Sequence, residues 1–205
     1  MPRRSDAKVR LLAAARYLIW TRSYGATSVD AICDLARVKK GSFYYFFASK
    51  SQLAVAAIDA DWNEKKPLLD EIFSSRTPPL ARLAHYFDYV AQRQSAMRRQ
   101  CGAVVGCPLF TLGCEVSTQD EAIRKKVHEI LLRYTRYFES AIRAAHAEGA
   151  IVAPKADRKA RLLFAFVQGS LTEARIHNDL QILRGMKAGA LELLGASARR
   201  VVIAA

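Results

Sequence analysis

The chain has 205 residues, and 51% of them are hydrophobic, so it is long enough for one or two domains and can bury a sizeable core. Its net charge of +13 favours a polyanionic partner, but charge alone does not separate nucleic acid from a membrane surface. The charge is uneven: residues 1–50 contain ten Lys and Arg against three Asp and Glu, whereas residues 51–205 contain 22 against 16.

The composition favours an all-α protein. Pro and Gly are few, at 6 and 10, and no run of alternating apolar residues predicts a sheet. No apolar stretch approaches the ~20 residues of a membrane span, and the N-terminus leads into an amphipathic helix with interior charges instead of a signal sequence. We therefore expect a cytoplasmic protein with no membrane partner.

The first predicted helix runs from about Ser5 to about Ser23, and Gly25 ends it. Thr27 or Ser28 then caps the first of two short helices. Apolar residues recur at helical spacing in both, at Val29, Ile32, Cys33 and Ala36 and again at Phe43, Phe46 and Phe47. Helices this short must pack on each other and on a third.

The second short helix is predicted to leave a basic and hydroxyl-rich face in solvent. This face consists of Lys39, Lys40, Ser42, Tyr44 and Tyr45, with Gly41 in the first turn. A helix needs such a face to enter the major groove of DNA. Residue by residue, the same side chains also fit an ordinary helical hairpin with an aromatic core and solvated lysines. It is their combination that favours DNA.

Residues 27–50, from Thr27-Ser28-Val29 through Lys40-Gly41-Ser42-Phe43-Tyr44 to Ser49-Lys50, resemble the helix-turn-helix of the TetR family of bacterial transcriptional repressors. The resemblance implies a DNA-binding domain over residues 1–50 and a helical ligand-binding and dimerisation domain over residues 51–205. It also implies two kinds of DNA contact. Lys40, Gly41, Ser42 and Tyr44 would approach base edges, and the backbone would be contacted by Thr27, Lys39, Tyr45 and Lys50.

Three residues depart from the family pattern. Arg37 replaces a Gly at the end of the first short helix, where a positive φ is common, so the turn is either strained or built differently. Lys39 replaces a Ser and removes the side-chain cap of the recognition helix. Phe46 replaces a His or Tyr and loses a polar contact to phosphate.

Longer helices are predicted after the helix-turn-helix. One runs from Lys50 to about Ser74 and contains Pro67, which predicts a kink; whether this is a hinge or a simple bend stays open. The others cover approximately residues 80–95, 119–148, 157–177 and 179–194. The last two resemble the dimer-forming helices of the family, which implies a homodimer and a pseudo-palindromic operator.

The segment from Gly106 to Ser117 resembles a signature of the NemR- and AcuR-like subgroup of the family, through Gly106-Cys107, Leu112, Glu115 and Ser117. Four cysteines in a cytoplasmic chain are expected to be reduced. Cys107 lies before a predicted helix N-terminus, which would favour a reactive thiolate. It is a candidate reactive thiol, while burial as a small hydrophobe is the alternative.

These observations favour a DNA-binding repressor that a small-molecule or electrophilic effector releases from its operator. Aromatic and thiol side chains of the second domain are candidates for the effector pocket: Trp62, Phe87, Tyr89, Phe110, Cys114, Tyr134 and Phe164. No arrangement of nucleophile, base, phosphate loop or metal ligands indicates an enzyme, a metal site or a cofactor. The alternative is a helical ligand-binding or interaction protein that does not bind DNA sequence-specifically.

Overall fold

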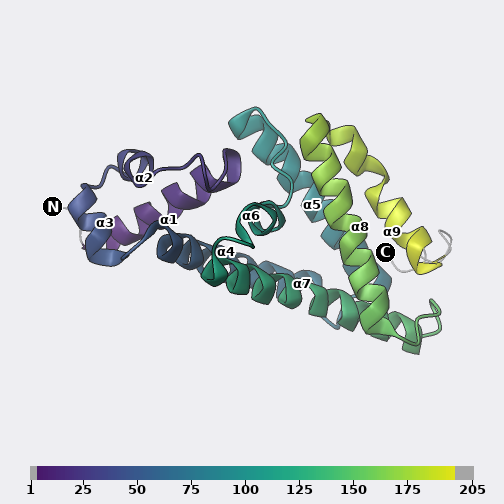
Figure 1. Cartoon of the computed structure of the whole chain (residues 1–205). Coiled ribbons are helices and arrows are strands. Elements are labelled where there is room, and N and C mark those ends of the chain that lie inside the picture. The colour runs from purple at the N-terminus through teal and green to yellow at the C-terminus, as the bar shows by residue number, and fades with distance from the viewer. Residues whose placement is uncertain (1–3, 197–205) are drawn as a thin grey trace. The chain divides into compact units, whose positions relative to one another are not determined.

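The computed structural model describes residues 4–196, and every regular element in that range is helical, so the all-α prediction is confirmed (Figure 1). In chain order the elements are α1 (Arg4–Thr21), α2 (Val29–Ala36), α3 (Lys40–Phe46), α4 (Lys50–Ile72), α5 (Pro79–Cys101), α6 (Pro108–Val116), α7 (Glu121–Ala147), α8 (Ala156–His177), the 3-10 helix η1 (Leu180–Gly185) and α9 (Met186–Leu194). Across these elements, none combines the length and apolarity needed to cross a lipid bilayer.

The chain divides into two compact units. Unit 1 combines residues Met1–Lys65 with Pro108–Ile130, and unit 2 combines Lys66–Cys107 with Leu131–Ala205. Helix α6 therefore belongs to the same unit as α1, α2 and α3. The predicted boundary at residue 50 concerns function and stays a prediction. The predicted domains also include residues 1–3 and 197–205, which lie outside the described part of the chain.

In unit 1, α1 packs against α2, α3 and α6. Leu11 of α1, Ile32 of α2 and Phe43 of α3 are all 0% exposed and form the centre of this core. Burial of a side chain of this size stabilises the fold by ~1.5 to 3 kcal/mol. Because α3 has only seven residues, such packing is what keeps it helical.

An ion cluster joins α1 to the first part of α4. The carboxylate of Asp61 is 2% exposed; it lies 2.5 Å from Lys65 Nζ and 3.6 Å from a guanidinium nitrogen of Arg16. Lys65 Nζ also lies 4.8 Å from the ring centroid of Trp20 on α1. A buried carboxylate is tolerated only when it is paired, so these cations fix the α1–α4 packing.

Unit 2 contains a cluster of aromatic rings. Tyr86 and Phe87 of α5 lie 5.0 and 6.4 Å from Phe138 of α7, and Phe164 of α8 lies 5.7 Å from the same ring, measured between centroids. Burial raises the pKa of the Tyr86 hydroxyl far above its usual value. Most of these rings therefore form core.

The longer helices differ from the predicted ones at their ends. Helix α5 continues to Cys101, six residues past the predicted end at Ser95, and stops at Gly102 with a φ of 77°. The last predicted helix begins instead as η1, where the side chain of Asp179 accepts a hydrogen bond from Gln181 N. Ser95 does not break a helix, so α5 continues past it. Asp179 does begin a helical segment, but its first residues, Leu180–Gly185, form a 3-10 helix.

The segment before α6 is held within unit 2. The Gln94 side chain donates to Gly106 O at 2.8 Å and accepts from Gly106 N at 3.0 Å. Asn178 accepts from Val104 N, and Arg175 donates to Val105 O. A Cβ on Gly106 would lie 3.0 Å from Leu171 O, and φ is 65°, so the position requires glycine.

Candidate nucleic-acid interface

Helix α2 begins with a side-chain cap and ends in a left-handed residue. Ser28 accepts a hydrogen bond from Ala31 N at 3.0 Å, so Ser28, and not Thr27, is the cap. Arg37 ends the helix with φ 52° and ψ 50°, and the N–H of Val38 bonds Cys33 O. Of the two alternatives for this turn, the structure therefore has the strained one, at a cost of ~1 to 2 kcal/mol for a residue other than glycine.

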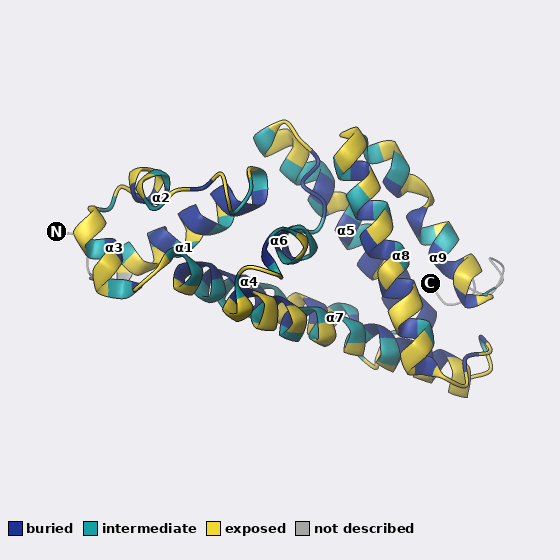
Figure 2. Cartoon of the chain, in the orientation of Figure 1, coloured by how far each residue is buried: buried dark blue, intermediate teal, exposed yellow. Residues whose placement is uncertain are grey.

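Helix α3 presents the expected face. Lys39 precedes it with no side-chain cap, as predicted. Phe43 is 0% exposed, whereas Tyr44 and Tyr45 on the opposite side are 55% and 66% exposed. Lys40 and Gly41 are also exposed, and Ser42 is half-buried. Figure 2 shows exposed stretches of α3 in yellow. Six of the predicted DNA contacts thus lie together on or beside α3.

Lys40 forms an ion pair with Asp30 of α2. Its Nζ lies 2.8 Å from one carboxylate oxygen, and both side chains are more than half exposed. The hydrogen bond to Asp30 raises the pKa of the Lys40 ammonium. Lys40 therefore stays cationic and is oriented along the exposed edge shared by α2 and α3.

Thr27 and Lys50 lie on the inner side of the loop before α2. The Thr27 side chain is 1% exposed and its hydroxyl donates to Ser23 O at 2.6 Å. Lys50 Nζ donates to Tyr24 O and Thr27 O, each at 2.9 Å, and lies 4.1 Å from the Tyr24 ring centroid. Burial lowers the pKa of Lys50, and the nearby Glu115 opposes this effect. The structure thus gives both residues intramolecular partners, and their contacts with DNA stay predictions.

Glu115 of α6 holds the same loop. Its carboxylate accepts from Tyr24 N at 3.0 Å and from Gly25 N at 2.6 Å. Thus α6 contacts the start of the helix-turn-helix through a charged acceptor and two backbone donors. The sequence offered no signal for this role, because the bonds join residues far apart in the chain and Glu115 stood out only as part of the Gly106–Ser117 signature.

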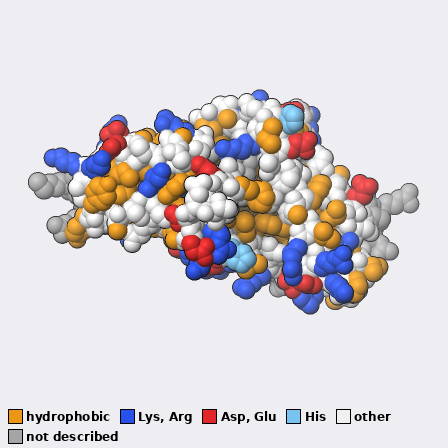
Figure 3. All heavy atoms as spheres, viewed as in Figure 1, with side chains coloured by type: hydrophobic (Ala, Val, Ile, Leu, Met, Phe, Trp, Pro, Cys, Tyr) orange, Lys and Arg blue, Asp and Glu red, His pale blue; other side chains and the backbone are white. Residues whose placement is uncertain are grey.

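A groove with a basic lining lies beside α3. It has a volume of about 410 Å³ and contains no Asp or Glu; its lining is Ala7, Arg10, Arg37, Val38, Lys39, Gly41, Ser42, Tyr45 and Phe46. In Figure 3, blue Lys and Arg side chains lie beside orange apolar ones over the part of the chain that contains α1 to α3. The residue type of Arg37 suggested only a difficulty in the turn, so its place in this groove was missed.

The predicted pocket residues fall into both compact units. Trp62, Phe110 and Cys114 belong to unit 1, and the other four belong to unit 2: Phe87, Tyr89, Tyr134 and Phe164. Trp62 and Phe87 are 4% and 1% exposed, so both are packed in core. The Tyr134 and Phe164 rings stack with centroids 6.5 Å apart. Their role in binding an effector stays a prediction.

All four cysteines are free thiols. Cys33 is buried, Cys101 and Cys107 are half-buried, and Cys114 is exposed. The Cys101 thiol donates to Met97 O at 3.1 Å. Between residues 4 and 196, no three His, Cys, Asp or Glu side chains form a group that would hold a metal ion.

Comparisons with known proteins agree with this geometry. Residues 11–57 match the family of bacterial regulatory proteins, tetR family, and residues 79–189 match the tetracyclin repressor-like C-terminal domain. The chain is 30% identical over 181 residues to an uncharacterized HTH-type transcriptional regulator of Lactococcus lactis, covering 87% of this chain and 88% of the relative. It is 29% identical to the transcriptional regulator AcuR of Cereibacter sphaeroides over 85% of this chain and 79% of AcuR.

The fold is also that of a solved regulator. The crystal structure of reduced Escherichia coli NemR superposes with a TM-score of 0.82 at 22% identity, covering 94% of this chain and 99% of NemR. The short α2, the turn at Arg37 and the exposed α3 define a helix-turn-helix DNA-binding regulator. Because both family domains match, the chain belongs to the TetR family and is a transcriptional regulator of the repressor type.

Proposed function

We propose that the protein is a homodimeric repressor that binds a pseudo-palindromic operator and leaves it when a small-molecule or electrophilic effector binds the helical C-terminal part. The observation that carries the proposal is α3, whose inner face is buried through Phe43 while Tyr44 and Tyr45 remain exposed beside Lys39 and Lys40. This is a face that can enter a major groove without unfolding the helix.

Base reading falls to the outer face of α3. Lys40 can donate to the O6 and N7 atoms of guanine, and the hydroxyls of Ser42 and Tyr44 can donate or accept at base edges. Apart from its chain neighbours and the nearby backbone of its own helix, a Cβ added to Gly41 would meet nothing within 4 Å among the described residues. Packing therefore does not require glycine there, and its value lies in close approach of the helix to DNA. Lys39 and Tyr45, which line the same groove, contact backbone phosphates.

Dimerisation falls to α8. Leu162 and Ile176 are 52% and 75% exposed, and they lie on one face of α8 with Ala165 and Gly169, which are also exposed. Apolar side chains and a glycine at helical spacing suit close packing against a second copy of the same helix. A two-fold axis through this face would present two α3 helices to operator half-sites ~34 Å apart.

The effector would act through the helical part that surrounds the aromatic residues of unit 2. Cys107 is half-buried and directly precedes α6, and its proximity is one of the causes that raise the pKa of Tyr86, after burial. A thiol at this position is a candidate for an electrophile. Any effector must bind the two states with different affinity in order to release DNA.

The test uses the DNA beside the gene of this protein. A labelled fragment that contains an inverted repeat should be shifted by the purified protein, and a panel of reactive carbonyls should release it. Cys107→Ser should abolish the response to carbonyls if the thiol is the sensor, with Cys101→Ser as the matched control. Leu162→Glu should give a monomer in analytical ultracentrifugation and weaken operator binding.

The second candidate function is a helical ligand-binding or interaction protein without sequence-specific DNA binding. The ion pair of Lys40 with Asp30 is the observation in its favour, because it engages a cation needed for base reading. Weak binding of equal strength to operator and random DNA would support this alternative and reject the repressor.

A further inference from the structure

Two adjoining grooves of unit 1 share the side chains of Arg10 and Arg37. The first is the basic groove of about 410 Å³ beside α3, which Lys39 also lines. The second has a volume of about 510 Å³ and is mostly apolar, lined by Ala13, Ala14, Tyr17, Leu35 and Ala36 together with the two arginines. The two guanidinium groups therefore stand at the border between an apolar wall and a basic groove.

These cations have no acidic partner within the described chain. No ion pair between residues 4 and 196 involves Arg10, Arg37 or Lys39, whereas many other cations of the same range are paired. The Nε of Arg10 is buried and lacks a hydrogen-bond partner among the described residues. A buried donor without a partner is costly, and an oxygen ligand in the groove would remove that cost.

Arg37 adds an argument from its backbone. Its left-handed conformation, with φ 52°, is one that glycine adopts without strain, and the two cap bonds come from backbone N–H groups that glycine also has. The turn therefore does not need an arginine. Its side chain instead extends the cationic lining of the groove, next to the hydroxyls of Ser42 and Tyr45.

We propose that Arg10, Arg37 and Lys39 together bind a backbone phosphate of DNA next to the major groove that α3 enters. The proposal rests on the proposed function and adds a phosphate contact that depends on Arg37, where the family pattern has a Gly. Arginine suits the role because its planar fork donates two hydrogen bonds to phosphate oxygens. Because the three cations would meet a phosphate and not a base edge, the contact sets register and grip without reading sequence.

The central variant is Arg37→Gly, which removes the cation and relieves the backbone. The thermal midpoint should rise or stay the same, while affinity for operator and for random duplex should both fall roughly tenfold. The slope of log K against log salt should become shallower by ~0.9 per protomer. A purely structural arginine would not separate stability from affinity in this way.

Further variants keep the test decisive. Arg37→Asn, which tolerates the same backbone conformation, should behave like Arg37→Gly, and Arg37→Lys should restore most of the salt slope. Arg136→Ala removes one exposed charge from α7 and should leave affinity and slope unchanged. Arg10→Ala should lower the affinity for operator and for random duplex. In the double variant with Arg37→Asn, the loss of binding free energy should be smaller than the sum of the two single losses.

Three results would overturn the proposal. Unchanged salt slopes in both neutral Arg37 variants would exclude a phosphate contact. A loss confined to the operator would mean that Arg37 reads bases. If inorganic phosphate raised the thermal midpoint of the wild type but not that of Arg37→Asn, the groove would be a site for a free anion. A wild type that binds operator and random duplex equally would instead reject the proposed repressor, while the phosphate contact would still be measured on random duplex.

Discussion

Lys50 and Glu115 hold complementary groups of the same loop. The ammonium of Lys50 donates to the carbonyls of Tyr24 and Thr27, and the carboxylate of Glu115 accepts from the N–H groups of Tyr24 and Gly25. The loop between α1 and α2 is thereby fixed by one residue from the start of α4 and one from α6. Together the two side chains satisfy backbone N–H and C=O groups of a loop that has no helical hydrogen bonds of its own to satisfy them.

Glu115→Gln should loosen this loop. The neutral amide offers one acceptor oxygen where the carboxylate offers two, so both backbone N–H groups lose a charged partner and one of them loses its acceptor. Amide hydrogen exchange at Tyr24 and Gly25 should accelerate, and the free energy of unfolding should fall by ~1 kcal/mol. Glu148→Gln, at an exposed position, is the control. Unchanged exchange at both amides would show that the carboxylate does not hold the loop in solution.

Lys50→Met should lower the stability of the protein clearly, while the salt dependence of DNA binding should change little. The variant keeps the aliphatic stem but leaves two carbonyls without their donor, at a cost of ~1 to 2 kcal/mol. Thermal unfolding and the salt slope are measured on the same preparation. If the slope falls by ~0.9 per protomer, Lys50 also contacts a phosphate; an unchanged slope removes it from the backbone contacts.

Asp30→Asn should strengthen DNA binding. The carboxylate pairs with Lys40 and places a negative charge beside the face of α3 that is proposed to meet DNA. Removing it frees the ammonium and ends the repulsion, so random duplex should bind several times more tightly at low salt. Asp34→Asn changes the net charge equally on the same helix and leaves the pair of Lys40 with Asp30 in place, so it is the control. Equal gains in both variants would point to net charge and not to the pair.

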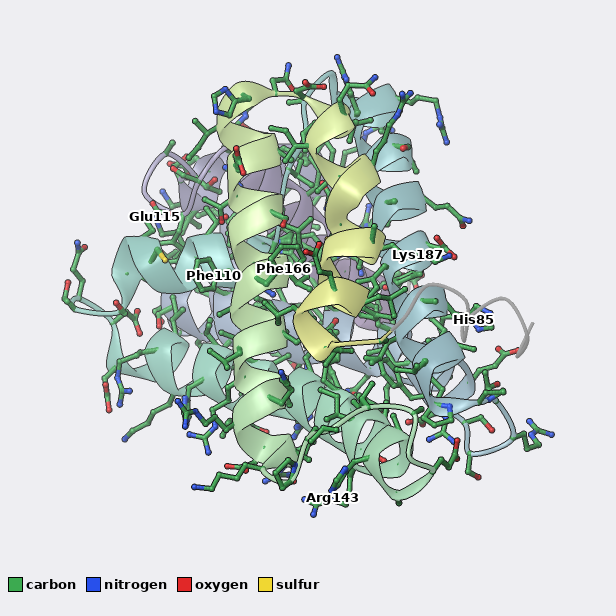
Figure 4. The ribbon with its side chains drawn as sticks, turned by 90° about the vertical axis from the view of Figure 1, so that its right-hand side faces the viewer. His85, Phe110, Glu115, Arg143, Phe166 and Lys187 are labelled. Carbon is green, nitrogen blue, oxygen red and sulfur yellow. The ribbon has the colours of Figure 1, made fainter. Side chains whose placement is uncertain are left out.

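Gly189→Val should destabilise the packing of α8 against α9. A Cβ on Gly189 would lie 2.9 Å from the tip of the Phe166 ring, which lies between the two helices in Figure 4. The expected loss is ~1 to 3 kcal/mol. Phe166→Leu in the same chain should recover much of it, as a double-mutant cycle of thermal or denaturant unfolding will show. Additive losses would mean that the ring is not the obstacle.

Acid should weaken unit 2 partly through Asp70. Hydrogen bonds from Lys66 and then from Tyr137 hold the pKa of Asp70 below its usual value. A carboxyl with a depressed pKa adds stability above its unfolded pKa and loses it as pH falls through the folded value. Asp70→Asn should therefore be less stable near neutral pH and should lose less stability below about pH 4. Parallel curves for the two proteins would exclude this contribution.

The fold was predictable because its signals are local. The helical spacing of Ile32 and Phe43 identified core positions, and both are fully buried. The missing cap at Lys39 and the difficult turn at Arg37 also follow from residue type alone. These properties depend on the backbone within one or two turns, so a single sequence contains them.

The remaining features depend on distant residues. Gln94 bonds Gly106 beyond the end of α5, and Glu115 reaches Gly25 across the sequence. Thr27 is an exception, because its hydroxyl donates to Ser23 O only four residues earlier, and its residue type suited a helix cap equally well. Which polar group meets which is decided by tertiary packing, and helical periodicity contains no information about it.

Because α3 has only seven residues, a short peptide cannot reproduce its recognition surface. A free peptide of that length is unstructured in water, because so few hydrogen bonds cannot offset the cost of starting a helix. In the protein, the burial of Phe43 and Phe47 beneath the recognition surface stabilises the helix instead. A synthetic mimic would therefore need a staple or a host scaffold that supplies an equivalent apolar seat. If only the outer residues were placed on another helix, their hydrogen-bonding groups would be present, but the packing that fixes their orientation would be missing.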